Sequence, residues 1–386
     1  MTPEFIPRSI TEQLYEYMDI FPAVSILGSR QCGKSTFVKH ISNMFHDMVY
    51  VDLQNRDDLA RLQEPNLFFR SNENVTICLD EIQLAPELFA VLRSEIDRNR
   101  RNGRFILLGS ASRQLLNNSS ESLAGRVGMI EMNPFSISEV NYRVDFSLTN
   151  FWFRGGYPLS YLAKNDTSAM IWLENFLKTY VEHDIIQSGF QVPPLQMFRL
   201  LSICANCQAT MLNMSKIAEI LSTTHPTIKK YIDILETTYL LRQLLPYSTN
   251  RNKRLVKSPK IYIRDNGILH SILRIQSFND LMGHPIFGAS WEGLVVEQVC
   301  QKYGKDRCFF YRTQDGNEAD LIIESDDGII MIECKASTAP QLTKGFWNVI
   351  DTLKPAKAFV VAPVSSPYKL RNNVKVCSIT DLLQEI

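Results

Sequence analysis

The stretch Gly28-Ser29-Arg30-Gln31-Cys32-Gly33-Lys34-Ser35 decides the fold of the first part of the chain, and it directly follows an apolar run over residues 23–27. After a buried strand, its two glycines let the backbone curl around an anion with N–H groups pointing inward, and the next helix offers its positive end. In such a loop Lys34 reaches the β- and γ-phosphates of a nucleotide, and the Ser35 hydroxyl binds Mg²⁺. A glycine-rich turn without a ligand gives the same pattern, so the segments that follow must decide.

A second apolar run, residues 75–79, ends in Asp80 and Glu81, some 45 residues after Lys34. It is typical of a buried parallel strand, and the carboxyl ends of parallel strands meet at one edge of a sheet. We therefore expect Asp80 to bind the metal and Glu81 to orient or deprotonate the attacking water. The alternative is an ordinary strand with a solvated acidic turn, and the spacing from Lys34 makes it the weaker one.

Two further residues are candidates for the same site. Ser110 ends the expected buried strand that runs from Arg104, and it would sense the γ-phosphate or its water, unless it only caps the next helix. Arg126, in the string SLAGR, would neutralise transition-state charge, an effect worth about 10³ to 10⁵ in rate, unless it is an ordinary surface residue. Arg126 could act in its own subunit or in a neighbouring one, which leaves a homo-oligomer open.

Composition favours an intracellular protein of several domains. The chain has 386 residues with 41 basic and 41 acidic side chains, so its zero net charge excludes a global polyelectrolyte role. Its eight cysteines are scattered, and the CxxC formed by Cys204 and Cys207 lacks a second pair or nearby histidines, which favours reduced core thiols. The start lacks the features of a leader and no apolar run approaches about 18 residues, so we expect a cytoplasmic protein without membrane contact.

Strand-like and helix-like stretches alternate up to about residue 145, which predicts a three-layer α/β domain over 1–145. Its expected strands are 23–27, 48–52, 75–80, 104–108 and 128–132. A helical lid beside the nucleotide is expected over 146–194, a winged helix over 195–256 and a further α/β domain over 257–386. The lid begins near Arg154-Gly155-Gly156-Tyr157-Pro158, where the glycines could merely separate two helices.

The segment 195–256 carries the signals of a winged helix. A short helix, a polar turn and a second helix opened by Pro226 are followed by a strand and a basic tract. Ile228, Ile232 and Leu235 repeat at helical spacing and predict the buried face of that second helix. Residues 211–260 hold nine Lys or Arg against three Asp or Glu, which favours DNA as a partner; a protein–protein spacer with paired basic residues gives the same charge count.

The final segment predicts a β-hairpin with a second candidate site. If Glu324 pairs with Ile329, then Asp320 pairs with Glu333, and directly opposed Cβ atoms lie about 4.5 to 5.5 Å apart. Like charges repel at that distance, and a divalent cation, Mg²⁺ or Mn²⁺, would relieve the repulsion. Lys335, two residues further on the same face, would steady a phosphate charge or a nucleophilic water.

Glu292 is the expected third carboxylate of this site. It shares a helical face with three valines, whereas Glu297 turns away from that face. The same hairpin register sets Glu318 opposite Lys335, so the alternative is a solvated cross-strand charge network without a metal.

Together these segments resemble the bacterial and archaeal AAA-type P-loop ATPases in which a P-loop domain and a winged helix precede a domain of unknown function related to the PD-(D/E)xK nuclease fold. The matching strings, from residue 25 to about 337, are GSRQCGKS, ICLDEIQLAPEL, FILLGSAS, SLAGR, NPFSISE, FRGGYP, TYVEHDI, HPTIKKYIDILE, KSPKIYIRDNGILH, WEGLVVE, NEADLIIE and IECKAS. The resemblance implies ATP binding by the loop and Thr36, and contact of Tyr157 and Pro158 with the nucleotide base. The nuclease-like residues that it implies are Glu292, Asp320, Glu333 and Lys335.

These features predict a DNA-associated ATPase whose nucleotide state controls the winged helix and the nuclease-like domain. One alternative is a regulatory switch that hydrolyses ATP slowly or not at all and uses its C-terminal domain only to recruit a partner. Another is an ATP-gated, metal-dependent endonuclease. The sensor position holds Ser110 where many AAA relatives have asparagine or threonine, a departure that bears on γ-phosphate sensing but not on nucleotide binding.

Overall fold

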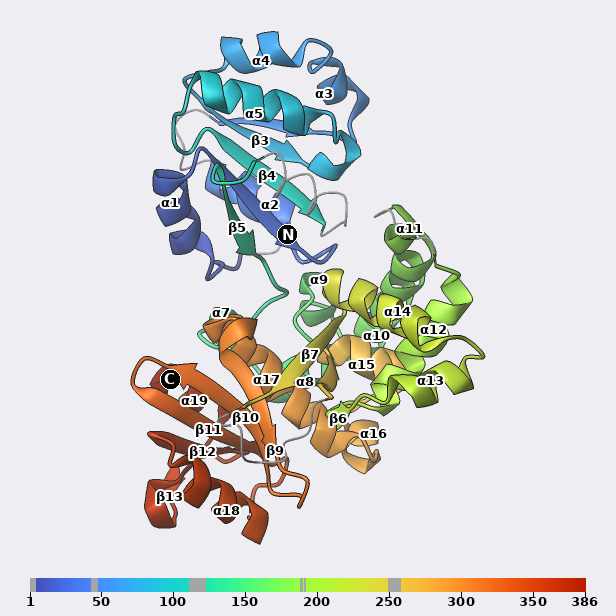
Figure 1. Ribbon diagram of the computed structural model, residues 1–386, viewed down its shortest axis with the longest axis vertical. Coiled ribbons are helices and arrows are strands. Elements are labelled where there is room, and N and C mark those ends of the chain that lie inside the picture. The colour runs from blue at the N-terminus through green and yellow to red at the C-terminus, as the bar shows by residue number, and fades with distance from the viewer. Residues whose placement is uncertain (1–4, 43–47, 111–122, 188–189, 191, 249–257) are drawn as a thin grey trace. The chain divides into compact units, whose positions relative to one another are not determined.

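A computed structural model describes residues 5–42, 48–110, 123–187, 190, 192–248 and 258–386 (Figure 1). The chain forms two compact units. The first unit comprises Met1–Phe135, Thr179–Val192 and Thr237–Tyr239, and the second comprises Ser136–Lys178, Pro193–Glu236 and Leu240–Ile386. The segments expected as lid, winged helix and C-terminal domain therefore fall mostly into one unit.

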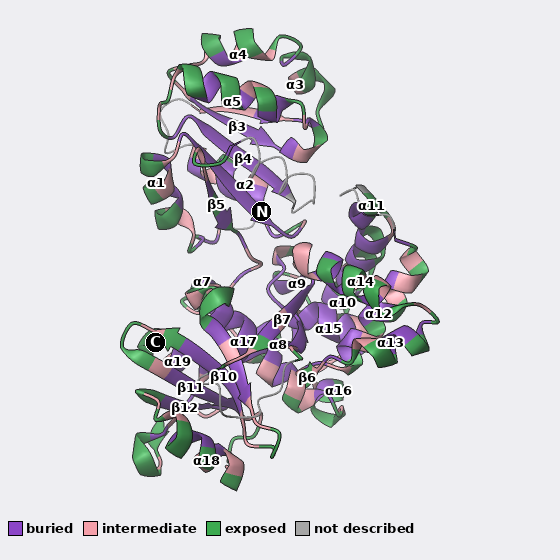
Figure 2. Cartoon of the chain, viewed as in Figure 1, coloured by how far each residue is buried: buried purple, intermediate pink, exposed green. Residues whose placement is uncertain are grey.

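A five-stranded parallel sheet forms the centre of the first unit, in the order β2-β3-β4-β1-β5. Its strands are β1 (Ala23–Gly28), β2 (Met48–Asp52), β3 (Thr76–Asp80), β4 (Phe105–Ser110) and β5 (Val127–Glu131). All five expected strands are confirmed. Every residue of β1 and β3 is buried, as expected for parallel strands covered on both faces, and Figure 2 shows β3 in the colour of buried residues.

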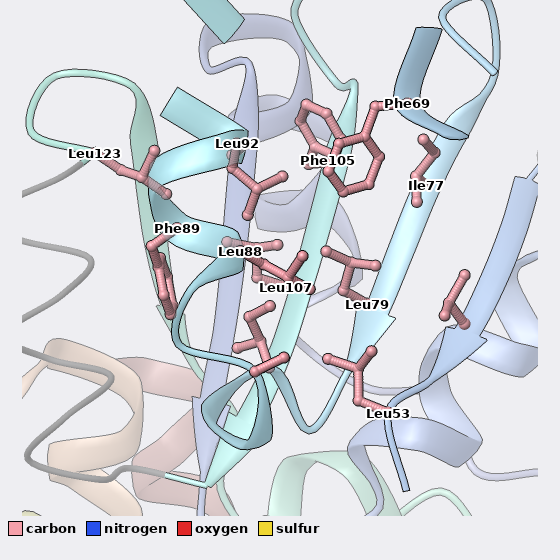
Figure 3. Close-up of a cluster of buried hydrophobic side chains, with 14 of the residues drawn as sticks. Leu53, Phe69, Ile77, Leu79, Leu88, Phe89, Leu92, Phe105, Leu107 and Leu123 are labelled. Carbon is pink, nitrogen blue, oxygen red and sulfur yellow. The ribbon is translucent and has the colours of Figure 1, made fainter. Parts of the chain in front are cut away.

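Helices cover both faces of this sheet and complete the three layers. One apolar cluster joins α4 (Pro65–Ser71) and α5 (Leu88–Arg98) to the sheet, and Figure 3 shows Leu88, Phe89 and Leu92 of α5 facing strand residues. A second cluster joins α1 (Thr11–Ile20) and α2 (Lys34–Ser42) to the other face. The shorter elements of this unit are α3 (Arg56–Ala60), η1 (Ile82–Leu84), the π-helical η2 (Tyr180–Asp184) and α11 (Ile185–Gln187).

The second unit combines a helical part with a mixed sheet. Its helices up to residue 237 are α7 (Ile137–Val140), α8 (Leu148–Arg154), α9 (Pro158–Tyr161), α10 (Asp166–Thr179), α12 (Pro194–Asn206), α13 (Met214–Ile220) and α14 (His225–Thr237). Those that follow are α15 (Asn266–Ile272), α16 (Phe278–Gly283), α17 (Phe287–Tyr303), η3 (Lys305–Arg307), α18 (Lys344–Leu353), η4 (Arg371–Asn373) and α19 (Ile379–Glu385). Ile228, Ile232 and Leu235 of α14 are fully buried, which confirms the expected face.

The sheet of the second unit has the order β13-β14-β12-β11-β10-β9-β7-β8-β6. Its strands are β6 (Thr210–Met211), β7 (Leu241–Pro246), β8 (Lys260–Ile263), β9 (Cys308–Arg312), β10 (Glu318–Ser325), β11 (Gly328–Cys334), β12 (Lys357–Val361), β13 (Tyr368–Lys369) and β14 (Lys375–Cys377). Strand β8 pairs with β6 and β7, and β7 continues the sheet by pairing with β9. The strands on either side of the expected boundary between residues 256 and 257, β7 and β8, thus pair with each other, and the domain bounds stay a prediction.

The hairpin of β10 and β11 has the expected register. Glu324 pairs with Ile329 and Leu321 with Ile332, so Asp320 and Glu333 are the next opposed residues. The eight cysteines are free thiols, and all but Cys207 are buried. Within the described ranges, every helix is too short or too polar to cross a bilayer.

Candidate nucleotide site and carboxylate cluster

The glycine-rich loop forms a closed cradle between β1 and α2. Gly33 has φ 101° and Gln31 has φ 64°, the left-handed values that a curled loop requires. The ammonium of Lys34 donates to the carbonyl oxygens of Gly28 at 3.0 Å and Ser29 at 2.8 Å. A Cβ atom on Gly28 would lie 2.1 Å from the Met132 carbonyl oxygen, so this position needs glycine.

Asp80 and Glu81 lie at the same edge of the sheet as the loop. Asp80 ends β3, and β4 alone separates β3 from β1 in a sheet whose strands all run parallel. The carboxylate of Asp80 accepts a hydrogen bond from the Glu81 backbone N–H at 2.9 Å. Glu81 itself has φ 56° and ψ 45°, a left-handed conformation that costs a non-glycine residue about 1 to 3 kcal/mol and is frequent at functional sites.

Tyr50 is a contact of the acidic residue that sequence reasoning missed. Its hydroxyl donates to Oδ2 of Asp80, and the Ser35 side chain also bonds to Tyr50. Burial, reinforced by Asp80, raises the pKa of Tyr50 far above its ordinary value, so the phenol stays protonated. Tyr50 thus links the two side chains that are expected to bind Mg²⁺. The sequence could have indicated this contact, because Tyr50 lies near the end of an expected parallel strand.

Asp184 is a second missed contact, and it reaches the loop from η2. It forms an ion pair with Arg30, and its side chain is 9% exposed. Burial raises the pKa of Asp184, the charge of Arg30 opposes the shift, and Glu81 adds to it. Asp184 is therefore close to both the loop and Glu81. The string TYVEHDI contains this residue, but the string alone does not indicate its partner.

Ser110 and Arg126 have different outcomes. Ser110 pairs in register with Gly28, so its backbone lies beside the loop, while its side chain is outside the described part of the structure. The backbone of Arg126 bonds to Ala23, the first residue of β1, so Arg126 lies about 17 Å from the loop at 3.3 Å per residue. The Arg126 guanidinium pairs with Asp97 at 2.6 Å. The structure therefore does not bring Arg126 to the loop of its own chain.

Tyr157 does not offer its ring to a nucleotide base. It is 1% exposed, and its ring packs against those of Trp172 and Phe176. Position 155 requires glycine for a structural reason, because Gly155 has φ 74° and a Cβ there would lie 2.2 Å from a carboxylate oxygen of Asp265. These contacts correct the expectation for Tyr157, whereas the base contact of the partly exposed Pro158 stays a prediction.

The loop residues fit ATP and Mg²⁺. The hydroxyl of Ser29 is buried, and within the described residues it has no hydrogen-bond partner, so the cradle holds an unused polar group. Ser35 and Asp80 would hold the metal ion, which when bound offsets phosphate charge. Lys34 already lies where its ammonium can exchange carbonyl oxygens for phosphate oxygens.

A cluster of charged side chains in the second unit contains the expected nuclease-like residues and a lysine that sequence reasoning missed. The ammonium of Lys260 lies 2.9 Å from Glu292, 2.7 Å from Glu318 and 3.6 Å from Asp320. The Tyr262 hydroxyl donates to the same Glu292 oxygen at 2.7 Å. The available signal was the alternation of lysine and tyrosine within an apolar strand at 260 and 262.

The hairpin end of this cluster is also paired. Asp320 accepts the backbone N–H of Cys334 at 2.8 Å, and Lys335 donates to Glu333 at 2.7 Å. Burial and the charge of Asp320 raise the pKa of Glu292 to about 7 and that of Glu333 to about 8. Lys260, Asp320 and Glu333 are buried, whereas Glu292, Glu318 and Lys335 are half-buried, so the cluster is only partly solvated.

The cluster does not fit a divalent metal ion as it stands. Among the residues that the structure describes, no three His, Cys, Asp or Glu side chains are arranged to hold one. The positive charge near Glu292 and Asp320 comes from Lys260 instead. Glu297, expected to turn away, is itself buried and bonds to Arg242 and Arg264.

The basic excess of residues 211–260 divides into buried and exposed side chains. Arg242 and Lys260 are buried and paired with carboxylates. Lys216, Lys229 and Lys230 are exposed on α13 and α14. The remaining four basic residues, at 251, 253, 254 and 257, lie outside the described ranges, as does the expected wing tip.

Comparison with known families agrees with the P-loop architecture of the first unit. Residues 21–141 match a family described as an AAA domain, which with the loop geometry defines an AAA-type P-loop ATPase domain. Residues 145–279 and 287–382 match two domains of unknown function, DUF8612 and DUF4143.

The chain belongs to the same family as an uncharacterized protein of Mycobacterium tuberculosis, to which it is 33% identical over 367 residues, 95% of this chain and 82% of the relative. A Mycobacterium bovis protein matches equally well, and a Haemophilus influenzae protein is 22% identical over 352 residues, 83% of this chain and 84% of that protein. Two solved structures show weak similarity, each with 12% identity and a TM-score of 0.27. They are the DNA clamp loader delta protein of Bacillus subtilis, covering 58% of this chain and 87% of that one, and a RuvB variant of Thermotoga maritima, covering 61% and 88%.

Proposed function

We propose that this protein binds and hydrolyses ATP with Mg²⁺ and associates with DNA, and that its nucleotide state controls the second unit. One observation carries the ATPase proposal. The Lys34 ammonium lies inside a loop at the same sheet edge as Asp80 and the strained Glu81. In this arrangement Lys34 binds phosphate, Asp80 binds the metal ion and Glu81 orients the attacking water.

Two substitutions test the ATPase proposal. Lys34→Ala should abolish ATP binding, measured with a fluorescent nucleotide analogue, because the ammonium in the cradle is lost. Glu81→Gln should keep binding and stop turnover, measured by phosphate release. Glu87→Gln, which alters an exposed glutamate of the same unit, is the matched control. Equal turnover in the Glu81→Gln variant and the control would refute the role of Glu81.

The DNA proposal rests on the exposed lysines of α13 and α14. Helix α12 and strand β6 precede these helices, β7 and β8 follow them, and β6 and β7 both pair with β8, an order that supports a winged helix. Lys229 and Lys230 are exposed on α14, whose opposite face is buried. Exposed lysines on one helix suit contacts with DNA phosphates.

Salt dependence of DNA binding measures these contacts directly. Each phosphate contact contributes about 0.9 to the slope of log K against log salt, so Lys229→Glu/Lys230→Glu should lower the slope by roughly 2. Lys164→Glu, which alters an exposed lysine outside this segment, should leave the slope nearly unchanged. Unchanged DNA binding by the double variant would favour the protein–protein spacer.

A second candidate function is a regulatory switch with a catalytically silent C-terminal domain, and the position of Lys260 among the carboxylates favours it. The competing candidate is an ATP-gated, metal-dependent endonuclease. Purified protein with ATP, Mg²⁺ or Mn²⁺, and labelled single-stranded, duplex and branched DNA separates the two. Cleavage that is lost in Lys335→Ala supports the nuclease, whereas binding without cleavage supports the switch.

A further inference from the structure

A lysine side chain lies among the carboxylates of the C-terminal cluster and is enclosed there. Lys260 is 3% exposed, and its ammonium also lies 5.6 Å from the ring centre of Phe310. Its backbone is paired on both sides, with Met211 on β6 and with Leu244 on β7. The strand therefore fixes the ammonium in place.

The cluster is nearly balanced in charge without any metal ion. Nζ of Lys260 contacts three carboxylates, Lys335 contacts a fourth, and Arg312 donates to Glu318 at 2.8 Å. Three cations and four carboxylates leave a single negative charge.

Lys260 remains charged in this environment. Its ammonium lies 2.9 Å from Glu292, 2.7 Å from Glu318 and 3.6 Å from Asp320, and carboxylates at these distances favour the charged form. A Mg²⁺ ion needs oxygen ligands at about 2.0 to 2.1 Å. The nearest Glu292 oxygen already accepts hydrogen bonds from Lys260 and Tyr262. A dication added beside Lys260 would bring uncompensated positive charge into a buried site, which is strongly unfavourable.

We propose that Lys260 is the built-in cation of this cluster and that it excludes a divalent metal ion from it. The inference goes beyond the ATPase and DNA proposals and depends on neither. It means that metal-dependent chemistry at Asp320 and Glu333 requires the removal of the Lys260 charge. The orphaned Oε2 atom of Glu333, which has no partner among the described residues, then becomes a ligand for an added metal ion.

Titration of the nucleotide-free full-length protein with Mn²⁺, followed by the electron paramagnetic resonance signal of free Mn²⁺, tests this proposal. Wild type and Asp320→Asn should bind Mn²⁺ equally, because the cluster takes no metal in either. Lys260→Met should gain one site that binds at least tenfold more tightly than wild type, and Lys260→Met/Asp320→Asn should lose it. Lys344→Met, which alters an exposed lysine, should match wild type.

Two results would overturn the proposal. One is a Mn²⁺ site in wild type that Asp320→Asn removes. The other is a Lys260→Met variant that is folded by circular dichroism but gains no site. If that variant does not fold, the comparison of wild type with Asp320→Asn decides alone, and equal binding supports the proposal. Any Mn²⁺ bound at the phosphate loop persists in Asp320→Asn, so it cannot imitate the result.

Discussion

Replacement of Glu297 by glutamine should strongly destabilise the second unit. The Glu297 side chain is 6% exposed and accepts hydrogen bonds from Arg242 at 2.7 and 3.0 Å. It also accepts two from Arg264, at 3.0 and 2.8 Å. Glutamine keeps the shape of the side chain, but it removes the negative charge that faces the two buried guanidinium groups.

The expected loss follows from the pKa of Glu297. Burial opposes the charged form, but the two arginines outweigh it and lower the pKa from 4.5 to about 2. At about 1.4 kcal/mol per pKa unit, the ionised form stabilises the folded state by roughly 3 kcal/mol. Because the folded pKa is depressed, this stabilisation is present above pH 4.5 and is lost as the pH falls towards 2. Removal of one partner of a buried ion pair typically costs about 3 to 5 kcal/mol, which agrees.

Urea unfolding followed by tryptophan fluorescence measures this loss selectively, because all four tryptophans of the chain lie in the second unit. At pH 7, Glu297→Gln should lower the free energy of unfolding by roughly 3 kcal/mol, and the difference from wild type should narrow below pH 4.5. Glu174→Gln, at an exposed position on α10, should change it by less than about 0.5 kcal/mol. A loss below about 1 kcal/mol for Glu297→Gln, or a difference independent of pH, would refute the assigned role of the ion pairs.

Three further changes test the first unit. Tyr50→Phe should leave metal-free ATP binding unchanged and raise the Mg²⁺ concentration for half-maximal hydrolysis about tenfold. The reason is the loss of the hydrogen bond from Tyr50 to the carboxylate of Asp80, worth about 1.5 to 3 kcal/mol. An unchanged Mg²⁺ dependence would contradict this prediction. Asp184→Asn should speed hydrogen exchange of the η2 backbone amides, measured by mass spectrometry, because the ion pair with Arg30 stabilises that segment. Unchanged exchange rates in η2 would contradict this role of the ion pair. Arg126→Ala should leave ATP affinity within twofold of wild type in a nucleotide titration, because the side chain lies at the other sheet edge, and a tenfold loss would contradict that placement.

Local sequence signals predicted the first unit well because each strand is a short, mostly apolar run that ends in a glycine or polar residue. The run expected over 75–80 forms β3 at Thr76–Asp80, and its parallel direction places Asp80 at the loop edge. The apolar spacing of α14 likewise indicated which residues are buried. The strand β3 and the buried face of α14 both depend on residues close together in the sequence, so the spacing of apolar residues predicts them.

The contacts that periodicity did not report join residues distant in the chain. Tyr50 lies 30 residues from Asp80, and Arg30 lies 154 residues from Asp184. A strand pattern indicates which way a side chain faces, but it does not indicate what lies opposite. For Arg126 the sequence predicted a contact that the structure does not show. The string SLAGR suggested a catalytic arginine, but the pairing of β5 with β1 places Arg126 at the sheet edge opposite the phosphate loop.

Residues 260–265 join elements of the second unit that are distant in the chain. Three of them at alternate positions, Lys260, Tyr262 and Arg264, reach two carboxylates of α17, Glu292 and Glu297. The adjacent aspartate at 265 accepts the backbone N–H of residue 156 at 2.8 Å and so binds the loop between α8 and α9. A shift of this strand by one residue would turn all three side chains to the other face and leave buried charges unpaired. A change that reaches β8 must therefore move the strands on either side of it together with α17.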